Sequence, residues 1–188
     1  MPMSDLRAVT GSAVRLAEIL READKRVAFA ESCTGGLVAA SLAQIPGISD
    51  HLCGSSVVYR TATKTAWLGV DPALLDDPAI GPVSAEVTRA LALAVLERTP
   101  EADLSAAVTG HLGPNAPPEL DGVVYVAVTE RAAPERVVAE LRHVLGAIGD
   151  DPAEVRCQRQ RTATKIVLDA VADVLASSGR GPNSEPAG

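Results

Sequence analysis

The chain has 188 residues, 47% hydrophobic and 22% charged, a composition typical of one soluble globular domain. A net charge of −7 and only four aromatic side chains argue against a surface for nucleic acid or anionic lipid. The three cysteines form no Cys-x-x-Cys pair, which indicates free thiols in a reducing compartment and no metal site. With no signal-peptide pattern and no membrane-length apolar run, we expect a cytoplasmic protein.

Hydrophobic periodicity predicts alternating helices and strands along the chain. Predicted helices cover residues 4–24, 37–44, 62–68, 84–98 and 150–177. Predicted strands cover residues 27–30, 52–59, 103–109, 123–128 and 136–144. Two proline-rich stretches, 71–82 and 111–121, are predicted loops, the first with one helical turn.

Helices that alternate with buried strands, followed by two adjacent strands, predict a three-layer α/β/α domain on a mixed sheet. We expect this single domain to occupy residues 1–178. The Gly/Pro-rich tail, residues 179–188, is predicted to be disordered.

Small polar residues fill the turn between the first predicted strand and the next helix. Thr34 is the predicted N-cap of that helix, and Gly35 and Gly36 let a ligand approach the backbone closely. The first N–H groups of a helix lack internal partners and favour a phosphate or an oxyanion. Ser32, at the edge of these donors, is a candidate nucleophile. A capped turn without chemistry fits these residues equally well.

A serine hydroxyl needs a base to take its proton. Lys64 is the best candidate, because it begins a helix after a strand aimed at the same edge, where burial would lower its pKa. An ordinary surface lysine is the alternative. Tyr59 is expected to orient the serine or the lysine, and His111 leaves a Ser-His-acid triad open. Cys33 is a weaker candidate nucleophile.

Five blocks of the sequence resemble, in order, the CinA C-terminal domain family, the nicotinamide-nucleotide amidases. The first is ESCTGG at 31–36, followed by Pro46-Gly47. The others are Tyr59-x-x-x-x-Lys64 with Leu68-Gly69-Val70, Gly81-x-Val83-Ser84, Ala107-Val108-Thr109-Gly110 with Gly113-Pro114, and Gly122-x-Val124-Tyr125. The resemblance implies the three-layer fold and hydrolysis of nicotinamide mononucleotide to nicotinic acid mononucleotide and ammonia. It covers residues 27–128, and more loosely extends to 175.

The resemblance places catalysis on Ser32 as nucleophile and Lys64 as base. We also expect Tyr59 and Thr109 at the catalytic centre. The expected substrate contacts are Glu31, Thr34, Gly35, Gly36, Gly110 and Arg156. Glu31 has a structural alternative, bonding to nearby backbone, and Arg156 an alternative on a solvated helix face. No metal or cofactor is expected; we expect a small-molecule substrate and a homo-oligomer.

The ligand end of the site departs from the family pattern. The family typically has Gly-x-x-Gly-Pro-Gly-Gly and then a cation. Here the stretch reads Gly113-Pro114-Asn115-Ala116-Pro117-Pro118, and Glu119 and Asp121 take the place of the cation. Gly149-Asp150-Asp151 stands where the family has Gly-Asp-Arg. Acids facing the pocket would disfavour an anionic mononucleotide. The alternative function is a ligand-binding or protein-interaction module with lost or altered activity.

Overall fold

The computed structural model describes residues 3–133 and 137–178. The predicted tail at 179–188 lies outside these residues. The helices are α1 (Met3–Ala23), α2 (Leu37–Ala43), α3 (Thr61–Leu68), α4 (Pro72–Asp76), α5 (Ala85–Arg98) and α6 (Pro152–Ser178). The strands are β1 (Val27–Glu31), β2 (Leu52–Val57), β3 (Leu104–Gly110), β4 (Val123–Glu130) and β5 (Val137–Val144). The short 3-10 turns η1 (Ile48–Asp50) and η2 (Pro118–Leu120) complete the elements.

The five strands form one mixed sheet in the order β2-β1-β3-β4-β5. β1 pairs in parallel with β2 and with β3, whereas β3 with β4 and β4 with β5 are antiparallel. At the end of β1, Glu31 pairs with Val57 of β2 and Val108 of β3. The carboxyl ends of the three parallel strands therefore meet at one edge, which is where α/β proteins place their ligands.

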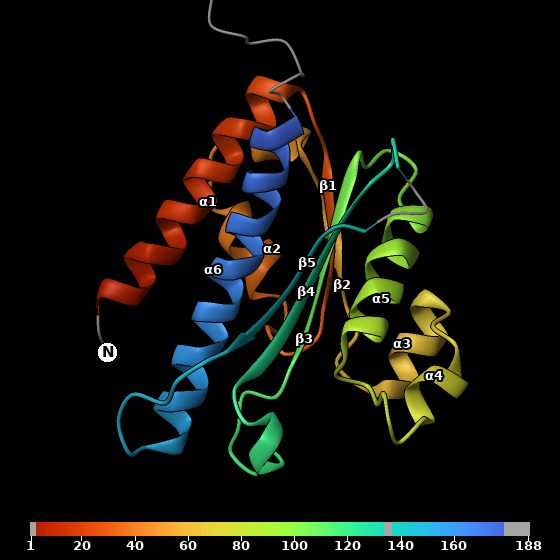
Figure 1. Cartoon of the computed structure of the whole chain (residues 1–188). Coiled ribbons are helices and arrows are strands. Elements are labelled where there is room, and N and C mark those ends of the chain that lie inside the picture. The colour runs from red at the N-terminus through yellow and green to blue at the C-terminus, as the bar shows by residue number, and fades with distance from the viewer. Residues whose placement is uncertain (1–2, 134–136, 179–188) are drawn as a thin grey trace, which may run out of the picture.

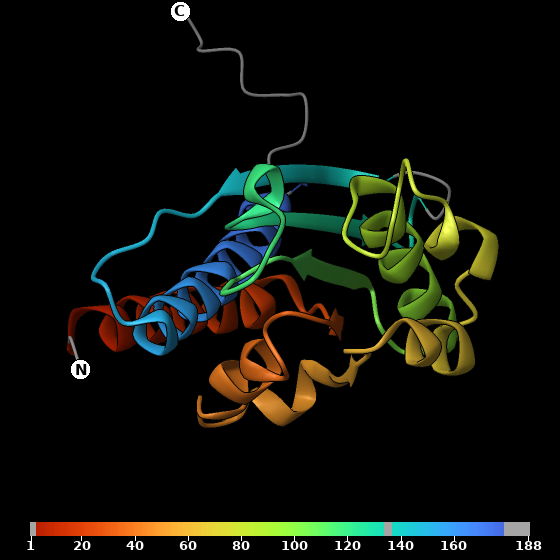
Figure 2. The ribbon, with the colours of Figure 1, turned by 90° about the horizontal axis from the view of Figure 1, so that it is seen from below.

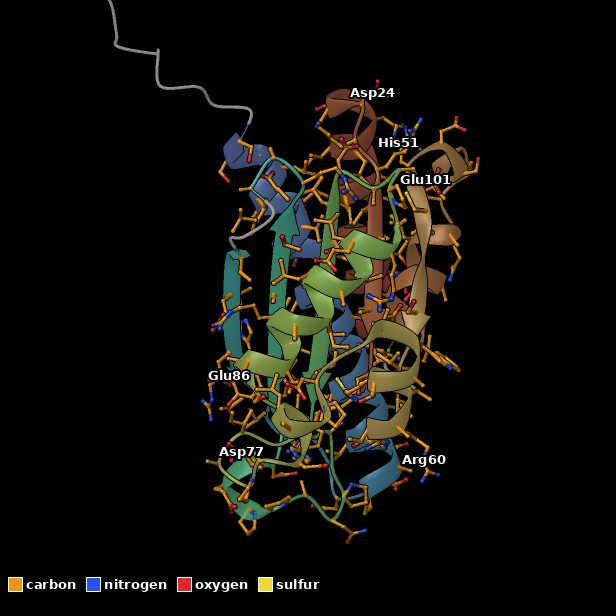
Figure 3. All side chains as sticks on the ribbon, turned by 90° about the vertical axis from the view of Figure 1, so that its right-hand side faces the viewer. Asp24, His51, Arg60, Asp77, Glu86 and Glu101 are labelled. Atoms are coloured by element: carbon orange, nitrogen blue, oxygen red, sulfur yellow. The ribbon has the colours of Figure 1, made fainter. Side chains whose placement is uncertain are left out.

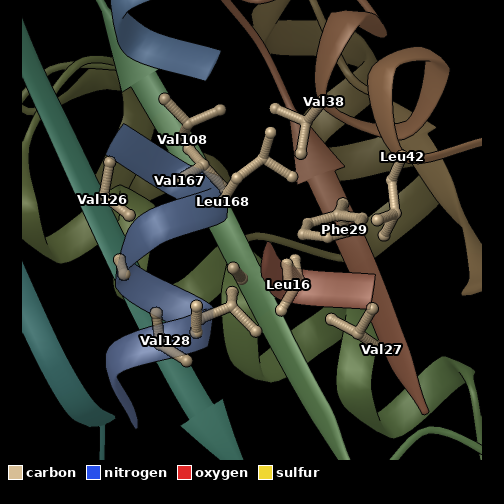
Figure 4. Close-up of a cluster of buried hydrophobic side chains, with 14 of the residues drawn as sticks. Leu16, Val27, Phe29, Val38, Leu42, Val108, Val126, Val128, Val167 and Leu168 are labelled. Atoms are coloured by element: carbon tan, nitrogen blue, oxygen red, sulfur yellow. The ribbon is translucent and has the colours of Figure 1, made fainter. Parts of the chain in front are cut away.

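Helices cover both faces of this sheet, as Figures 1 and 2 show, with α1, α2 and α6 on one side and α3, α4 and α5 on the other. Strand β1 is buried along its whole length, because each of its faces meets a helical layer. Phe29 packs with Leu16 and Leu168 on the α1/α6 side (Figure 4). Ala28 and Ala30 pack on the α5 side. The predicted three-layer α/β/α fold is confirmed.

The structure also confirms the predicted cap of α5 and the predicted hairpin. The Ser84 side chain caps α5 by accepting from the Val87 N–H at 3.2 Å. The strands expected at 123–128 and 136–144 form the β4–β5 hairpin. None of the helices in the described part of the chain has both the length and the apolar character needed to cross a bilayer.

Candidate active site

The candidate site lies where the three parallel strands end. Ser32 follows β1, Val58 follows β2 and His111 follows β3. In Figure 3 this end of the molecule is marked by Arg60, which precedes α3. Asp24 and His51 mark the opposite end. The order β2-β1-β3 places Ser32 between the segments that follow the other two strands.

Ser32 and Lys64 form a buried pair at this edge. The Nζ atom of Lys64 lies 3.2 Å from Ser32 Oγ and 3.0 Å from the Val58 carbonyl oxygen. Lys64 is only 2% exposed, and burial lowers the pKa of its amine. Together, β2 and α3 thus hold a lysine that can lose its proton within hydrogen-bond reach of a serine hydroxyl. A solvated surface lysine is excluded.

Glu31 is a structural anion, not a group that faces the cavity. It is completely buried, and its carboxylate accepts from Thr34 Oγ1 at 2.8 Å and from Ser55 Oγ at 2.9 Å. It also accepts from the backbone N–H groups of residues 36, 38 and 39, each at 3.0 Å. The exposed start of α2 that the sequence suggested as a phosphate or oxyanion site is therefore filled by the protein's own carboxylate.

The N-cap prediction for Thr34 is wrong. Helix α2 begins at Leu37, and its N-cap is Gly36, in the left-handed region at φ 98°. Gly35 is also left-handed, at φ 63°. The Thr34 hydroxyl donates to Glu31 because that carboxylate, buried beneath the turn, is the stronger acceptor. Neither Thr34 nor the two glycines is among the residues that line the cavity beside Ser32.

Cys33 stands next to Ser32 but has the chemistry of an inert thiol. Its side chain is buried, and desolvation raises its pKa to about 12. A thiol in that state carries almost no thiolate at neutral pH. The lowered pKa that would have made Cys33 a competing nucleophile is contradicted, because burial raises the pKa and the first N–H groups of α2 donate to Glu31 instead.

A cavity of about 270 Å³ opens beside the Ser32–Lys64 pair. The residues that line it are Ser32, Cys33, Tyr59, Thr61, Lys64, Pro82, Val83, Gly110, His111, Leu112, Gly113, Pro114, Asn115, Ala116 and Arg156. No aspartate or glutamate is among these lining residues, so Arg156 gives the cavity wall a positive charge that no lining carboxylate offsets. The walls come from all three segments that follow the parallel strands and from the first turns of α6.

Arg156 lies on the cavity wall, at the ligand end expected from the sequence. One guanidinium nitrogen donates to the Gly113 carbonyl oxygen, and another donates to Tyr59 Oη at 2.7 Å. Tyr59 is 55% exposed. The hydroxyl of Tyr59 therefore bonds Arg156 across the cavity rather than Ser32 or Lys64, which corrects its expected orienting role.

Thr109 is not among the residues that line the cavity. It is completely buried, and its hydroxyl lies 2.8 Å from Thr88 Oγ1, which in turn donates to the Ser84 carbonyl oxygen at 2.6 Å. Its bonds therefore join β3 to the start of α5. Gly110, one residue further, does line the cavity. A Cβ atom there would lie 3.0 Å from Cys33 Sγ, so the close approach of these segments requires glycine.

The acids of the 111–121 loop do not face the cavity. Asp121 forms a bidentate pair with Arg159, with both N···O distances 2.7 Å, and Glu119 is an exposed residue outside the lining set. Arg159 is 5% exposed and also donates to the carbonyl oxygens of Leu112 and Gly146. The Asp121 carboxylate is thus paired with Arg159 outside the cavity.

Two contributors to the site escaped the sequence reasoning. Gln160 donates to the carbonyl oxygens of Thr34 at 2.9 Å and Cys33 at 3.3 Å, and so holds the Ser32 turn from α6. Thr61 lines the cavity. The available signal for Gln160 was its position four residues after Arg156, on the same face of a predicted helix. Among the described residues, no group of three or more His, Cys, Asp or Glu side chains is placed to hold a metal.

Fold and site together define a three-layer α/β protein with a buried Ser–Lys pair at the carboxyl edge of its parallel strands. The chain belongs to the CinA C-terminal domain family, whose model matches residues 10–171.

Curated relatives include the CinA-like protein of Chlorobium phaeovibrioides, 42% identical over 118 residues, or 62% of this chain and 27% of that protein. The CinA-like protein of Mycobacterium leprae is 46% identical over 92 residues, or 49% of this chain and 21% of that protein. The matches span about a quarter of the length of these relatives.

Solved structures match over nearly the whole domain. The competence/damage inducible protein CihA from Agrobacterium tumefaciens has a TM-score of 0.76 at 28% identity, covering 89% of this chain and 95% of that one. The competence-damaged protein (CinA) superfamily protein from Enterobacter cloacae has a TM-score of 0.75 at 25% identity, covering 89% and 92%.

Proposed function

We propose that this protein is an amidohydrolase that uses Ser32 as its nucleophile and Lys64 as its base. The observation that carries the proposal is the 3.2 Å contact between Lys64 Nζ and Ser32 Oγ inside a buried, cavity-lining pair. An amine whose pKa is lowered by burial supplies the unprotonated base that a weakly nucleophilic hydroxyl requires.

In the acylation step, neutral Lys64 takes the proton of Ser32 while Oγ bonds to the amide carbon. The tetrahedral species then breaks its C–N bond, and the ammonium of Lys64 returns the proton to the departing nitrogen, which leaves as ammonia. Water next attacks the ester, again with Lys64 as proton acceptor, and the proton passes to Ser32 Oγ as the acid departs. The Val58 carbonyl oxygen orients the amine through both steps, because it accepts from Nζ at 3.0 Å.

We propose nicotinamide mononucleotide as the substrate, with the amide at Ser32 and the phosphate toward Arg156. The proposal derives from the family resemblance and is supported by the charge of the cavity wall, which holds the guanidinium of Arg156 and, among its lining residues, no carboxylate. Opposite unit charges at ~4 Å attract by about 4 kcal/mol at an effective dielectric of 20. With Asp121 paired to Arg159, the loop acids do not offset this attraction.

The test is ammonia release from a panel holding nicotinamide mononucleotide, nicotinamide riboside and unrelated primary amides. We expect turnover of the mononucleotide, a loss of about 10⁴-fold or more in Ser32→Ala, and near-parental rates in the matched control Cys33→Ala. Turnover by Ser32→Ala at a tenth of the parental rate, with the fold intact by circular dichroism, would contradict the proposal. A parent that binds the mononucleotide without hydrolysing it would instead be a ligand-binding module.

We propose a cytoplasmic setting, supported by the three free thiols, of which Cys157 is exposed. Assembly into a homo-oligomer stays a prediction, to be checked by sedimentation of the purified protein.

A further inference from the structure

His111 has no part in the mechanism above, yet it lines the same cavity. It directly follows β3, and its backbone is fixed on both sides: its N–H donates to the Val123 carbonyl oxygen, and its carbonyl oxygen accepts from the Gly122 N–H, both at 2.8 Å. Lys64 is anchored to Val58, which follows β2. Because β1 lies between β2 and β3, Lys64 and His111 approach Ser32 from opposite sides.

The groups that surround His111 in the cavity are cations and neutral side chains. The ionisable ones are Lys64 from α3, Arg156 from α6, Tyr59 and the Cys33 thiol. The acids in its own loop are turned elsewhere, since Asp121 is paired with Arg159 and Glu119 lies outside the lining set. Within the described residues, no carboxylate is positioned in the cavity to hold the imidazole as a cation.

Burial lowers the pKa of His111 below its ordinary value of 6.5, so the imidazole of the empty cavity is neutral at neutral pH. An anion bound in the same cavity acts in the opposite direction, because a nearby negative charge favours the protonated ring. The protonated ring also offers two N–H donors where the neutral ring offers one donor and one acceptor.

We infer that His111 is a specificity-determining residue that contacts the ligand and takes up a proton when a phosphate-bearing ligand fills the cavity. The inference rests on the proposed function, since it assumes that the mononucleotide is the ligand. His111 then becomes a second cation beside Arg156 when an anionic ligand is bound. An uncharged or cationic relative of the ligand does not cause this protonation.

Calorimetry tests this in a Ser32→Ala background, which prevents turnover. The mononucleotide and its riboside are titrated between pH 5.5 and 8 in buffers of different ionisation heat, with His111 intact and as His111→Gln. The phosphate itself titrates near pH ~6. The informative quantity is therefore the dissociation constant of the mononucleotide for His111→Gln divided by that for the protein with His111, because the phosphate titration cancels in this ratio at each pH. Riboside binding in both proteins confirms an intact cavity.

We expect the mononucleotide to bind with more proton uptake when His111 is present than in His111→Gln, because the phosphate and Lys64 titrate in both proteins. The dissociation constant of His111→Gln relative to the intact protein should rise as the pH falls, by up to about tenfold for each unit by which the bound anion raises the imidazole pKa. A ratio that is flat between pH 8 and 5.5 overturns the inference and leaves the proposed function standing. A parent that binds no mononucleotide at any pH overturns the proposed function, and this inference with it.

Discussion

Burying Lys64 costs free energy, because its amine exchanges water for two hydrogen-bond partners. A lysine side chain that is 2% exposed has lost its hydration, and its bonds to Val58 and Ser32 replace water with one carbonyl and one hydroxyl oxygen. No carboxylate accepts from Nζ among the hydrogen bonds of the described chain. Such an environment favours the neutral amine, which is the state that a base needs.

The lowered pKa of Lys64 predicts the pH dependence of the reaction. We expect kcat/KM to rise with pH through that pKa and to level off above it, because the neutral amine is the active form. Lys64→Arg should lose about 10²-fold to 10⁴-fold in rate, since arginine keeps the charge but stays protonated. The matched control is Lys165→Arg, on a half-exposed lysine of α6. Parental rate and pH profile in Lys64→Arg would reduce Lys64 to an electrostatic group.

For single residues, the sequence predicted the Ser32–Lys64 pair but not the hydrogen-bond partners of the polar residues near it. Glu31 and Thr109 have the residue types of a polar site, and whether each faces a cavity or a neighbouring strand depends on how β2 and α5 pack against them. The capping of α2 is an example. The carboxylate that satisfies its first N–H groups comes from the end of β1, and the sequence indicated only the nearest hydroxyl, Thr34.

The 111–121 loop is held against α6 by the buried side chain of Leu112 and by polar contacts from two arginines. Arg159 joins Asp121 to the carbonyl oxygens of Leu112 and Gly146, and Arg156, one turn earlier, donates to the Gly113 carbonyl oxygen. The first turns of α6 thus position the cavity wall. Asp121 stands where the family has a cation, and its pair with Arg159 helps to fix the loop that Arg156 contacts.

Removing this pair tests the role of the loop. Asp121→Asn leaves a buried guanidinium without its counter-charge. We expect the free energy of unfolding, measured with denaturant, to fall by about 1–2 kcal/mol. This value is smaller than for a fully buried pair, because Asp121 is 44% exposed and solvent screens the interaction. The KM for the substrate should rise more than kcat falls. The control Glu119→Gln, on an exposed side chain of the same loop, should stay within about 0.5 kcal/mol.

Arg159 holds the pKa of Asp121 below its ordinary value of 3.8. The stability that the pair contributes is therefore complete above that value, and is lost as the pH falls through the lowered pKa. A parent and an Asp121→Asn variant with equal stability at pH 7 would contradict this account of the loop.

The fold was more predictable than the site, for physical reasons. Strand β1 and helix α1 follow from local periodicity, and the parallel-then-hairpin order of the sheet follows from helices between strands and a short connection before β5. The Asp121–Arg159 pair joins residues 38 positions apart, and the Arg156–Tyr59 bond joins residues 97 apart. Periodicity carries no information about such long-range polar contacts.

At the scale of the whole molecule, a protein of net charge −7 encloses a cavity whose permanently charged lining residue is the cation Arg156. The acids lie elsewhere on the described surface, for example Asp24, Asp77 and Glu101, labelled in Figure 3. Attraction of an anionic substrate therefore has to come from the local wall rather than from the overall field, and over more than about 8 Å physiological salt screens the surface charges. We accordingly expect specificity to depend on the 111–121 loop and on the first turns of α6.

The central claim is that amide hydrolysis proceeds through an ester on Ser32, and a single-turnover quench measures it directly. Protein in excess is mixed with nicotinamide mononucleotide, quenched in acid at intervals that cover the first turnover, and digested for peptide mass analysis. We predict an acyl group on the peptide that contains Ser32, assigned by fragmentation to that residue, which forms with ammonia release and decays with appearance of the acid. Complete turnover with no acylated peptide at any interval, or acylation of Cys33, would contradict it.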